Sequence, residues 1–224
     1  MQPATEDHLH YADTIVAEME SSAKARGTGI AKRSPDYVRL KMEEGKAVIA
    51  LTTEGEWVGF CYIETWSHGQ YVANSGLIVA PLYRKSGVAK AIKKQIFRLS
   101  REKYPDAKIF GLTTSLAVMK INSDLGYEPV TYSELSQDEA FWNGCKSCVN
   151  YDILMSKERK NCLCTAMLYD PVEAAERKKE LEDEFKESQA RSQEEEEPKL
   201  FDFLSKQKVL ERLQRIKQTV FGGK

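Results

Sequence analysis

The residues best suited to chemistry lie where an apolar strand runs into a turn and then a helix, between Gly76 and Ile92. Small residues at Ser86, Gly87 and Ala89 let the backbone approach a ligand closely, and the start of a helix presents unpaired N–H groups. Three cations surround these small residues, namely Arg84, Lys85 and Lys90. The pattern predicts an anion site of the kind that holds a phosphate. An ordinary strand–turn–helix connection that contains a glycine is the alternative.

Four cysteines in two close pairs form a second group of reactive residue types. They are Cys145, Cys148, Cys162 and Cys164. We expect residues 149–155 and 166–169 to form two strands of a hairpin, which would bring the two pairs together. Four thiolates suit tetrahedral Zn²⁺, so the sequence predicts a four-Cys metal hairpin with structural zinc within residues 142–169. Iron, free core thiols and a redox pair are the alternatives.

Polar side chains on the central strands are the candidates for acid–base catalysis. Glu64 lies on the strand expected at residues 57–66, and Asn74 interrupts the apolar strand expected at residues 71–79. Strand alternation puts three aromatic residues on the same face as Glu64, namely Phe60, Tyr62 and Trp66. Desolvation by such neighbours raises the pKa of a carboxylate, as a general base requires. A strand-edge charge that faces solvent is the alternative for Glu64, and Asn74 would orient substrate or a water.

The elements that must position these residues follow from hydrophobic periodicity and turn residues. Helices are expected at residues 4–26, 34–45, 86–103 and 115–125. Strands are expected at residues 46–52, 57–66, 71–79, 108–113 and 129–132. Two helices, a strand meander and a strand–helix–strand unit predict an α/β (α+β) fold with a mixed, mostly antiparallel sheet flanked by helices.

The turn resembles the R/Q-x-x-G-x-G/A motif of the GNAT superfamily of N-acyltransferases. It reads Arg84-Lys85-Ser86-Gly87-Val88-Ala89, directly after a Val-x-Pro-x-Tyr-Arg lead-in. The resemblance covers about residues 5–132 and implies the GNAT fold with acetyl-CoA or succinyl-CoA as co-substrate. It further implies that the pyrophosphate binds the N–H groups of residues 85–90. The pantetheine arm would pair with the backbone of Leu77, Ile78 and Val79, where two strands splay.

The resemblance also implies the reaction, in which an amine attacks the thioester, a base takes the amine proton and donors stabilise the oxyanion. The family often places Tyr four residues before the glycine that closes the next helix. That glycine is Gly126 here, and the position holds Asn122. Asn cannot donate a titrating proton, so the thiolate leaves unassisted or another group such as Tyr127 serves. Asn122 stays a hydrogen-bond donor near the CoA sulfur, with a surface or capping residue as the alternative.

The loop between the first two helices lies over the acceptor site in this family. Its cations are Arg26, Lys32 and Arg33, and Arg forks suit the capture of carboxylates. A solvated basic loop is the alternative. The segments RGTGIAKRSP, FCYIETW, FGLTTSLAVMKINSDLGY and FWNGCKSCVNYDIL look like a group of bacterial GNAT proteins associated with arginine biosynthesis. This resemblance implies transfer of the acyl group to L-glutamate, a small-molecule amine acceptor.

Composition and charge indicate which compartment and which partners to expect for this chain. The 224 residues carry a formal net charge of -1, which argues against non-specific nucleic-acid binding. No apolar run approaches the roughly 18 residues of a membrane helix, and the polar N-terminus lacks the features of a signal peptide. We therefore expect a cytoplasmic protein with no nucleic-acid or membrane partner, in which thiols stay reduced.

The chain is expected to divide into an acyltransferase domain at residues 1–171, a charged helical or disordered linker at 172–199 and an amphipathic helix at 200–224. That helix would dock on its own domain or on a second copy in a homodimer, with a membrane surface as the rival. Two other functions remain open. One is a non-catalytic, acyl-CoA-binding regulatory protein, which the missing tyrosine favours, and the other is a protein N-acetyltransferase.

Overall fold

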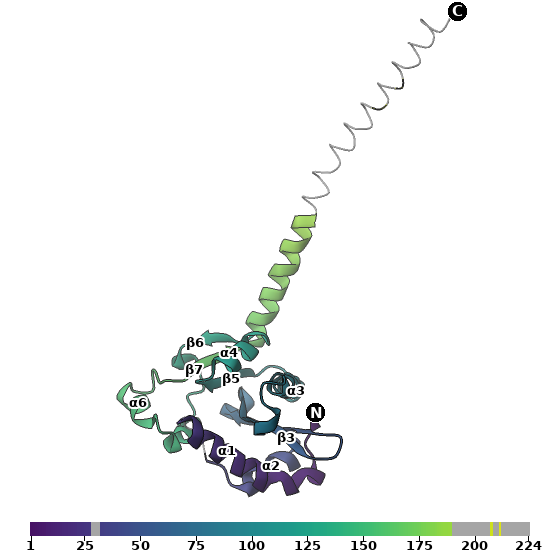
Figure 1. Ribbon diagram of the computed structural model, residues 1–224. Coiled ribbons are helices and arrows are strands. Elements are labelled where there is room, and N and C mark those ends of the chain that lie inside the picture. The colour runs from purple at the N-terminus through teal and green to yellow at the C-terminus, as the bar shows by residue number, and fades with distance from the viewer. Residues whose placement is uncertain (28–31, 190–206, 208–210, 212–224) are drawn as a thin grey trace, which may run out of the picture. The chain divides into compact units, whose positions relative to one another are not determined.

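A computed structural model of the chain describes residues 1–27, 32–189, 207 and 211 (Figure 1). The chain divides into two compact units, Met1–Ala174 and Ala175–Lys224. In the second unit, residues 175–189 are helical. The amphipathic helix predicted at residues 200–224 lies outside the described residues, apart from positions 207 and 211. No helix among the described residues is long and apolar enough to cross a membrane.

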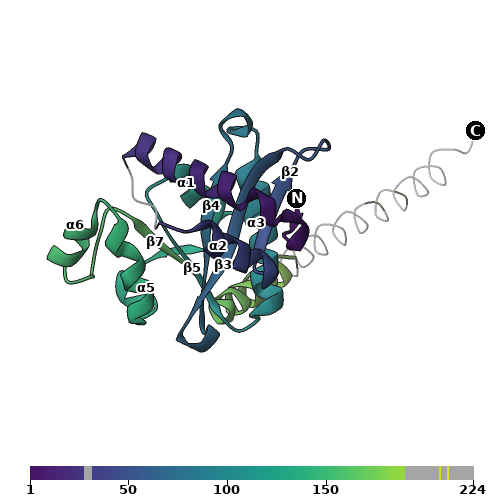
Figure 2. The same cartoon turned by 90° about the horizontal axis from the view of Figure 1, so that it is seen from below.

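The first unit is built on a seven-stranded sheet in the order β1-β2-β3-β4-β5-β7-β6 (Figure 2). Its strands are β1 Gln2–Pro3, β2 Ala47–Leu51, β3 Trp57–Trp66, β4 Tyr71–Val79, β5 Lys108–Thr113, β6 Glu128–Val130 and β7 Thr165–Tyr169. Within this sheet β4 and β5 run parallel, and the other neighbouring pairs run antiparallel. The predicted mixed, mostly antiparallel sheet is confirmed.

The helices begin and end at the residues that their capping preferences favour. Ser34 caps α2 by accepting a hydrogen bond from the Tyr37 backbone N–H at 3.2 Å, with Pro35 at the first helical position. Gly27 ends α1 in the left-handed region, at φ +60°. The α-helices of the first unit are α1 Ala12–Arg26, α2 Pro35–Glu43, α3 Val88–Lys103, α4 Leu116–Ser123, α5 Glu139–Asn143 and α6 Tyr151–Ser156. The 3₁₀ turns are η1 Glu6–Tyr11, η2 Ser67–Gly69, η3 Pro81–Tyr83, η4 Tyr132–Glu134 and η5 Gly144–Ser147.

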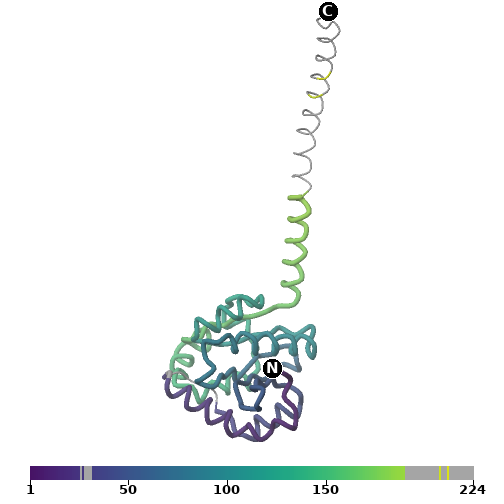
Figure 3. The backbone as a smooth tube through the Cα atoms, turned by 45° about the vertical axis from the view of Figure 1, so that its right-hand side comes forward, coloured from purple at the N-terminus to yellow at the C-terminus, as the bar shows by residue number. Residues whose placement is uncertain are grey.

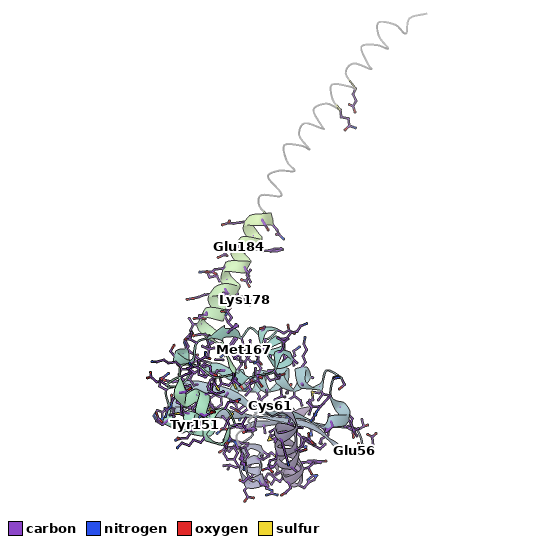
Figure 4. All side chains as sticks on the ribbon, turned by 60° about the vertical axis from the view of Figure 1, so that its left-hand side comes forward. Glu56, Cys61, Tyr151, Met167, Lys178 and Glu184 are labelled. Atoms are coloured by element: carbon purple, nitrogen blue, oxygen red, sulfur yellow. The ribbon has the colours of Figure 1, made fainter. Side chains whose placement is uncertain are left out.

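Helices cover both faces of the sheet because successive residues of each strand point to opposite sides. On one face, Ile49 and Phe60 pack with residues of α1 and α2. On the other face, Val48 and Cys61 pack with Ile92 and Ile96 of α3, and Figure 4 shows Cys61 in the interior of this unit. Burying a side chain the size of isoleucine stabilises the fold by roughly 1.5–3 kcal/mol.

A third apolar cluster lies at the β5–β7 end of the sheet. Phe110 and Leu168 pack there with Phe141 and Trp142 of α5 and with Leu154 of α6. Figures 1 and 3 both place α1 and α2 on the opposite side of the first unit from α4 and β6. Several of the predicted site residues line a cavity next to the middle strands.

Two irregularities of β4 open the sheet in the middle. Tyr62 pairs with Ser75 and Phe60 with Ile78, so β4 has an extra residue opposite β3, which is a β-bulge. Gly76 takes φ +64° there, and a Cβ atom on it would lie 2.2 Å from Cε1 of Tyr62. On the other edge β4 pairs with β5 only from Tyr71 to Ala73. Beyond Ala73 the two parallel strands diverge.

The predicted cysteine hairpin is wrong in one of its two strands. Residues 151–156 form the helix α6 rather than a strand, and β7 pairs with β5 and β6 instead. A short apolar run does not distinguish a strand from a buried helix by itself. Leu154 of α6 is buried against the β5–β7 end of the sheet, and this tertiary packing decides in favour of the helix.

Candidate active site

A cavity of about 820 Å³ opens between the α1–α2 connection, the middle strands and the cysteine-containing segment. Many of the residues predicted from the sequence line it, namely Lys32, Arg33, Glu64, Asn74, Leu77, Asn122, Cys145, Cys148 and Cys164. The cavity lining does not include Tyr127, Ile78, Val79 or the turn at residues 84–90. The side chain of Arg26 lies outside the described residues.

The predicted phosphate turn forms the start of α3. Gly87 precedes the helix with φ +86°, and no side chain caps the first turn. The N–H groups of Val88, Ala89 and Lys90 therefore remain available in the way typical of an anion site. A Cβ atom at Gly87 would meet no heavy atom of the described residues within 4 Å, so the space beside Gly87 is open.

The cations of this turn serve different purposes. The Arg84 guanidinium donates to the carbonyl oxygen of Val79 at 3.0 Å and to Glu18 and Ser22, each at 2.6 Å. Arg84 thus ties the end of β4 to α1. Lys90 forms an ion pair with Asp124 at 2.6 Å. Both side chains already have partners at this turn, so we expect the backbone N–H groups to provide its main anion contacts.

Glu64 and Arg33 meet at the α1–α2 side of the cavity. The Arg33 guanidinium donates to Glu64 Oε1 at 2.9 Å and to the Tyr62 hydroxyl at 2.8 Å, and the Tyr37 hydroxyl donates to Glu64 Oε2 at 2.6 Å. Burial opposes the charge on Arg33, yet Tyr62 and Glu64 outweigh burial and raise its pKa. Burial, followed by the hydrogen bond to Glu64, raises the pKa of Tyr37. Glu64 is buried, so the solvent-facing alternative does not hold.

A second polar group lies deeper, where β4 and β5 diverge. The Tyr127 hydroxyl donates to Asn74 Oδ1 at 3.1 Å, and Asn74 Nδ2 donates to Ser100 at 2.8 Å. Tyr127 is part of the core on the α3 side, and burial raises its pKa well above the usual value. Asn122 is 1% exposed, and in the described part of the chain its Oδ1 has no hydrogen-bond partner. Tyr127 therefore holds Asn74 in place, while Asn122 presents an unpaired acceptor.

Sequence reasoning missed Lys93, which belongs to this deeper group. Lys93 is 2% exposed and lines the cavity from α3. Its Nζ lies 5.2 Å from the centre of the Tyr127 ring, and desolvation lowers the pKa of Lys93 to about 8. Helical spacing from Ala89 and Phe97 would have placed Lys93 beside the apolar stripe of α3. Because this helix carries many cations, Lys93 could not be distinguished by sequence from the solvated ones.

The four cysteines are free thiols near the outer part of the cavity. Burial raises the pKa of Cys164 to about 12, and the neighbouring thiols of Cys162, Cys148 and Cys145 add to the increase. The two cysteine pairs are therefore close in space. Even so, the described residues contain no group of three or more Cys, His, Asp or Glu side chains arranged to hold a metal ion. The structure does not support the predicted zinc site.

Part of the sequence of this chain matches a known protein family. Residues 16–119 match the Acetyltransferase (GNAT) family. A search of curated proteins found no match.

Solved structures share the fold at low identity. N-acetylglutamate synthase from Neisseria gonorrhoeae, complexed with coenzyme A and N-acetyl-glutamate, matches 71% of this chain with a TM-score of 0.52 and 15% identity. Our chain spans only 32% of that synthase. Rv2747 from Mycobacterium tuberculosis, in complex with CoA, matches 75% of this chain and 97% of its own, with a TM-score of 0.53 and 15% identity.

A third structure is a phosphinothricin acetyltransferase of the GNAT superfamily from Sinorhizobium meliloti, in complex with AcCoA. It matches 75% of this chain and 86% of its own, with a TM-score of 0.50 and 14% identity. This chain carries an acetyltransferase domain of the GNAT family over residues 16–119.

Proposed function

We propose that the protein transfers an acyl group from acetyl-CoA or succinyl-CoA to the amino group of L-glutamate. The observation that carries the proposal is the gap between β4 and β5, which offers room for a CoA arm beside the cavity that Arg33 lines. The uncapped start of α3 and the unpaired edge of β4 suit a CoA thioester. Arg33 lines the cavity on its α1–α2 side, where it would meet an acidic acceptor.

The donor half fits an extended arm that ends in a pyrophosphate. After Ala73 no described strand pairs with the β4 edge on the β5 side, so its N–H and C=O groups need acceptors and donors from elsewhere. An extended chain with amide groups supplies them as an added strand does. The pyrophosphate would then reach the N–H groups at the start of α3, where the helix dipole favours negative charge.

The acceptor half fits a carboxylate. A guanidinium carries five N–H donors, and Arg33 uses three of them, toward Tyr62, Glu64 and the carbonyl of Lys32. Two remain, which is the number that a bidentate carboxylate needs. The contact with Glu64 holds the guanidinium in the orientation that presents them. The likeness to N-acetylglutamate synthase supports glutamate as the acceptor, and N-acylglutamate formation would serve arginine biosynthesis in the cytoplasm.

In this reaction the neutral amine attacks the thioester carbonyl carbon, and the C–S bond breaks. We place Glu64 near the amino group, where its carboxylate takes up the amine proton directly or through a water. Asn74 lies beside the bulge of β4 and would position the thioester, with Tyr127 holding its amide.

Steady-state kinetics with acetyl-CoA and succinyl-CoA against a panel of amino acids tests the proposal. We expect CoA release with glutamate and much slower release with glutamine, which lacks the second carboxylate. Release that does not depend on any amino acid would contradict it.

A non-catalytic acyl-CoA-binding protein is the second candidate, and the replacement of tyrosine by Asn122 favours it. The two candidates differ in a direct way. Tight acetyl-CoA binding in calorimetry without CoA release in the presence of any acceptor would identify the regulatory protein.

Zinc at the four cysteines stays a prediction. The two cysteine pairs lie close together, but the described residues hold no arrangement of ligands for a metal ion. Elemental analysis of protein purified without chelators tests it, and less than one zinc ion per chain would rule out a structural site.

A further inference from the structure

Lys93 is an unusual side chain for the interior of a protein. Among the described residues it is the only buried lysine, with 2% of its surface exposed. No carboxylate of the described part of the chain lies within ion-pair distance of its Nζ, which faces the Tyr127 ring instead. Buried charges are normally paired. A lysine without an anionic partner at the wall of a cavity therefore points to a partner supplied by a ligand.

Asn122 provides an independent sign of a ligand at the same place. It is buried, with 1% of its surface exposed, and it lines the same cavity. Its Oδ1 has no hydrogen-bond partner among the described residues. Its Nδ2 donates a hydrogen bond to the Met167 sulfur at 3.7 Å. An unmade hydrogen bond of this kind costs about 1–3 kcal/mol. Together, Lys93 and Asn122 offer one cationic donor and one acceptor to a group in the cavity.

The position of these two residues along β4 indicates which group that is. On the proposed function, the pyrophosphate lies at the start of α3 and the arm runs back along β4 from Val79 toward Asn74. Five residues of strand span about 17 Å at about 3.3 Å per residue. The thioester end of the arm therefore reaches the point where β4 and β5 diverge, which is where Lys93, Asn74 and Asn122 line the cavity.

We propose that Lys93 and Asn122 form the pocket for the CoA sulfur and that Lys93 is the general acid that protonates the departing thiolate. The inference rests on the proposed function. When the tetrahedral intermediate collapses, the C–S bond breaks and its electron pair stays on sulfur. An N–H proton of Lys93 passes to this sulfur, and the S–H bond that forms donates to Asn122 Oδ1. Solvent then returns a proton to Lys93, and the proton that the amine lost passes to solvent, so no net proton is gained or lost by the protein.

The electrostatic setting suits this role. The titratable groups that face Lys93 are the thiol of Cys61 on β3 and the phenol of Tyr127. Burial raises the pKa of Cys61 to about 11 and that of Tyr127 well above its usual value, so both are neutral at physiological pH. Desolvation lowers the pKa of Lys93 to about 8, close to the ordinary value of a thiol. An acid and a leaving group of matched pKa exchange a proton efficiently.

The test compares the wild-type chain with Lys93→Met, which keeps the length and apolar stem of the side chain. Lys94→Met is the matched control, because Lys94 is the exposed neighbour on α3. Three quantities are measured: the Kd of acetyl-CoA by calorimetry, kcat as a function of pH, and the pKa of the bound CoA thiol from the ultraviolet absorbance of its thiolate.

We expect Lys93→Met to bind acetyl-CoA as the wild type does and to lose about a hundredfold or more in kcat. Wild-type kcat should fall as the pH rises through about 8, and this limb should vanish in the variant. The bound CoA thiol should be more acidic in the wild type, because an adjacent ammonium stabilises its thiolate. Lys94→Met should change none of these.

Other results would overturn the inference. Unchanged kcat and pH profile in Lys93→Met, with normal acetyl-CoA binding, would leave Lys93 a structural residue. A variant that loses succinyl-CoA turnover but keeps acetyl-CoA turnover would assign Lys93 to the acyl chain instead. If Lys93→Met does not fold, the wild type alone decides. The inference is then wrong if wild-type kcat does not fall as the pH rises through about 8 and if the bound CoA thiol is no more acidic than that of free CoA. Failure of the wild type to bind acetyl-CoA would instead refute the proposed function.

Discussion

Replacing Gly87 by glutamate tests the donor site most directly. Gly87 has φ +86°, and open space surrounds the position of its Cβ atom. Any side chain there carries the cost of a left-handed backbone, about 1–2 kcal/mol of folding free energy, but no clash. Gly87→Gln is the matched control because it has the same size and the same backbone cost without the charge. The difference between the two variants therefore isolates electrostatics.

The size of this difference follows from Coulomb's law. A carboxylate about 6 Å from a doubly charged pyrophosphate is repelled by roughly 1.4 kcal/mol at the dielectric constant of water, and about four times more at an effective value of 20. The lower figure corresponds to a loss of about tenfold in affinity. We expect Gly87→Glu to bind acetyl-CoA at least about tenfold more weakly than Gly87→Gln.

Isothermal calorimetry at two salt concentrations measures this effect. Salt screens exposed charges, so the gap between the glutamate and glutamine variants should shrink at high salt. Circular dichroism verifies that both variants fold. If Gly87→Glu binds acetyl-CoA as tightly as Gly87→Gln in low salt, the pyrophosphate does not lie at the start of α3 and the donor site is misplaced.

Three further predictions concern the acceptor, the bulge and the stability in acid. Arg33→Met should raise the KM for glutamate by about 10- to 150-fold, the equivalent of about 1.5–3 kcal/mol for a charge-assisted contact, and should end the discrimination against glutamine in steady-state assays. Gly76→Ala should lower the free energy of unfolding in urea by roughly 2–5 kcal/mol, since its Cβ would lie 2.2 Å from a Tyr62 ring carbon and φ is +64°; an unchanged midpoint would contradict the bulge. Burial raises the pKa of Asp170, but the ion pair with Lys108 at 2.7 Å and the backbone N–H groups of Val172 and Glu173 together outweigh burial, so the folded pKa lies below the ordinary value of 3.8. The stability from this pair is then present above pH 3.8 and lost as the pH falls through the lower folded pKa, and Asp170→Asn should flatten that part of a Tm-against-pH curve.

Local patterns in the sequence determined much of the fold. Ser34, Pro35 and Gly27 act through backbone preferences that do not depend on distant residues, and the ends of α1 and α2 lie where these residues predict. The strands at Trp57–Trp66 and Tyr71–Val79 coincide with their predicted ranges, because aromatic and β-branched residues between turn residues favour strands. The start of α3 was evident for the same reason, since Gly87 stands directly before an amphipathic helix.

The chemistry of the cavity depends on contacts between residues far apart in the chain, and only the tertiary structure decided it. Arg84 looked like a phosphate ligand, but Glu18 and Ser22, from a different helix, engage its guanidinium. Residues 151–156 form a helix because the β5–β7 end of the sheet offers Leu154 an apolar surface.

Lys93 is the clearest case. Its neighbours in the sequence suggest one more solvated cation on a basic helix. Its burial comes from the β3–β4 layer and from Tyr127, whose positions follow from sheet order and packing. The sequence alone determined the family motif, the strand order along the chain and the helix ends, because these follow from local preferences. The tertiary structure decided which polar groups are buried, paired or left without a partner, because burial is a property of the assembled layers.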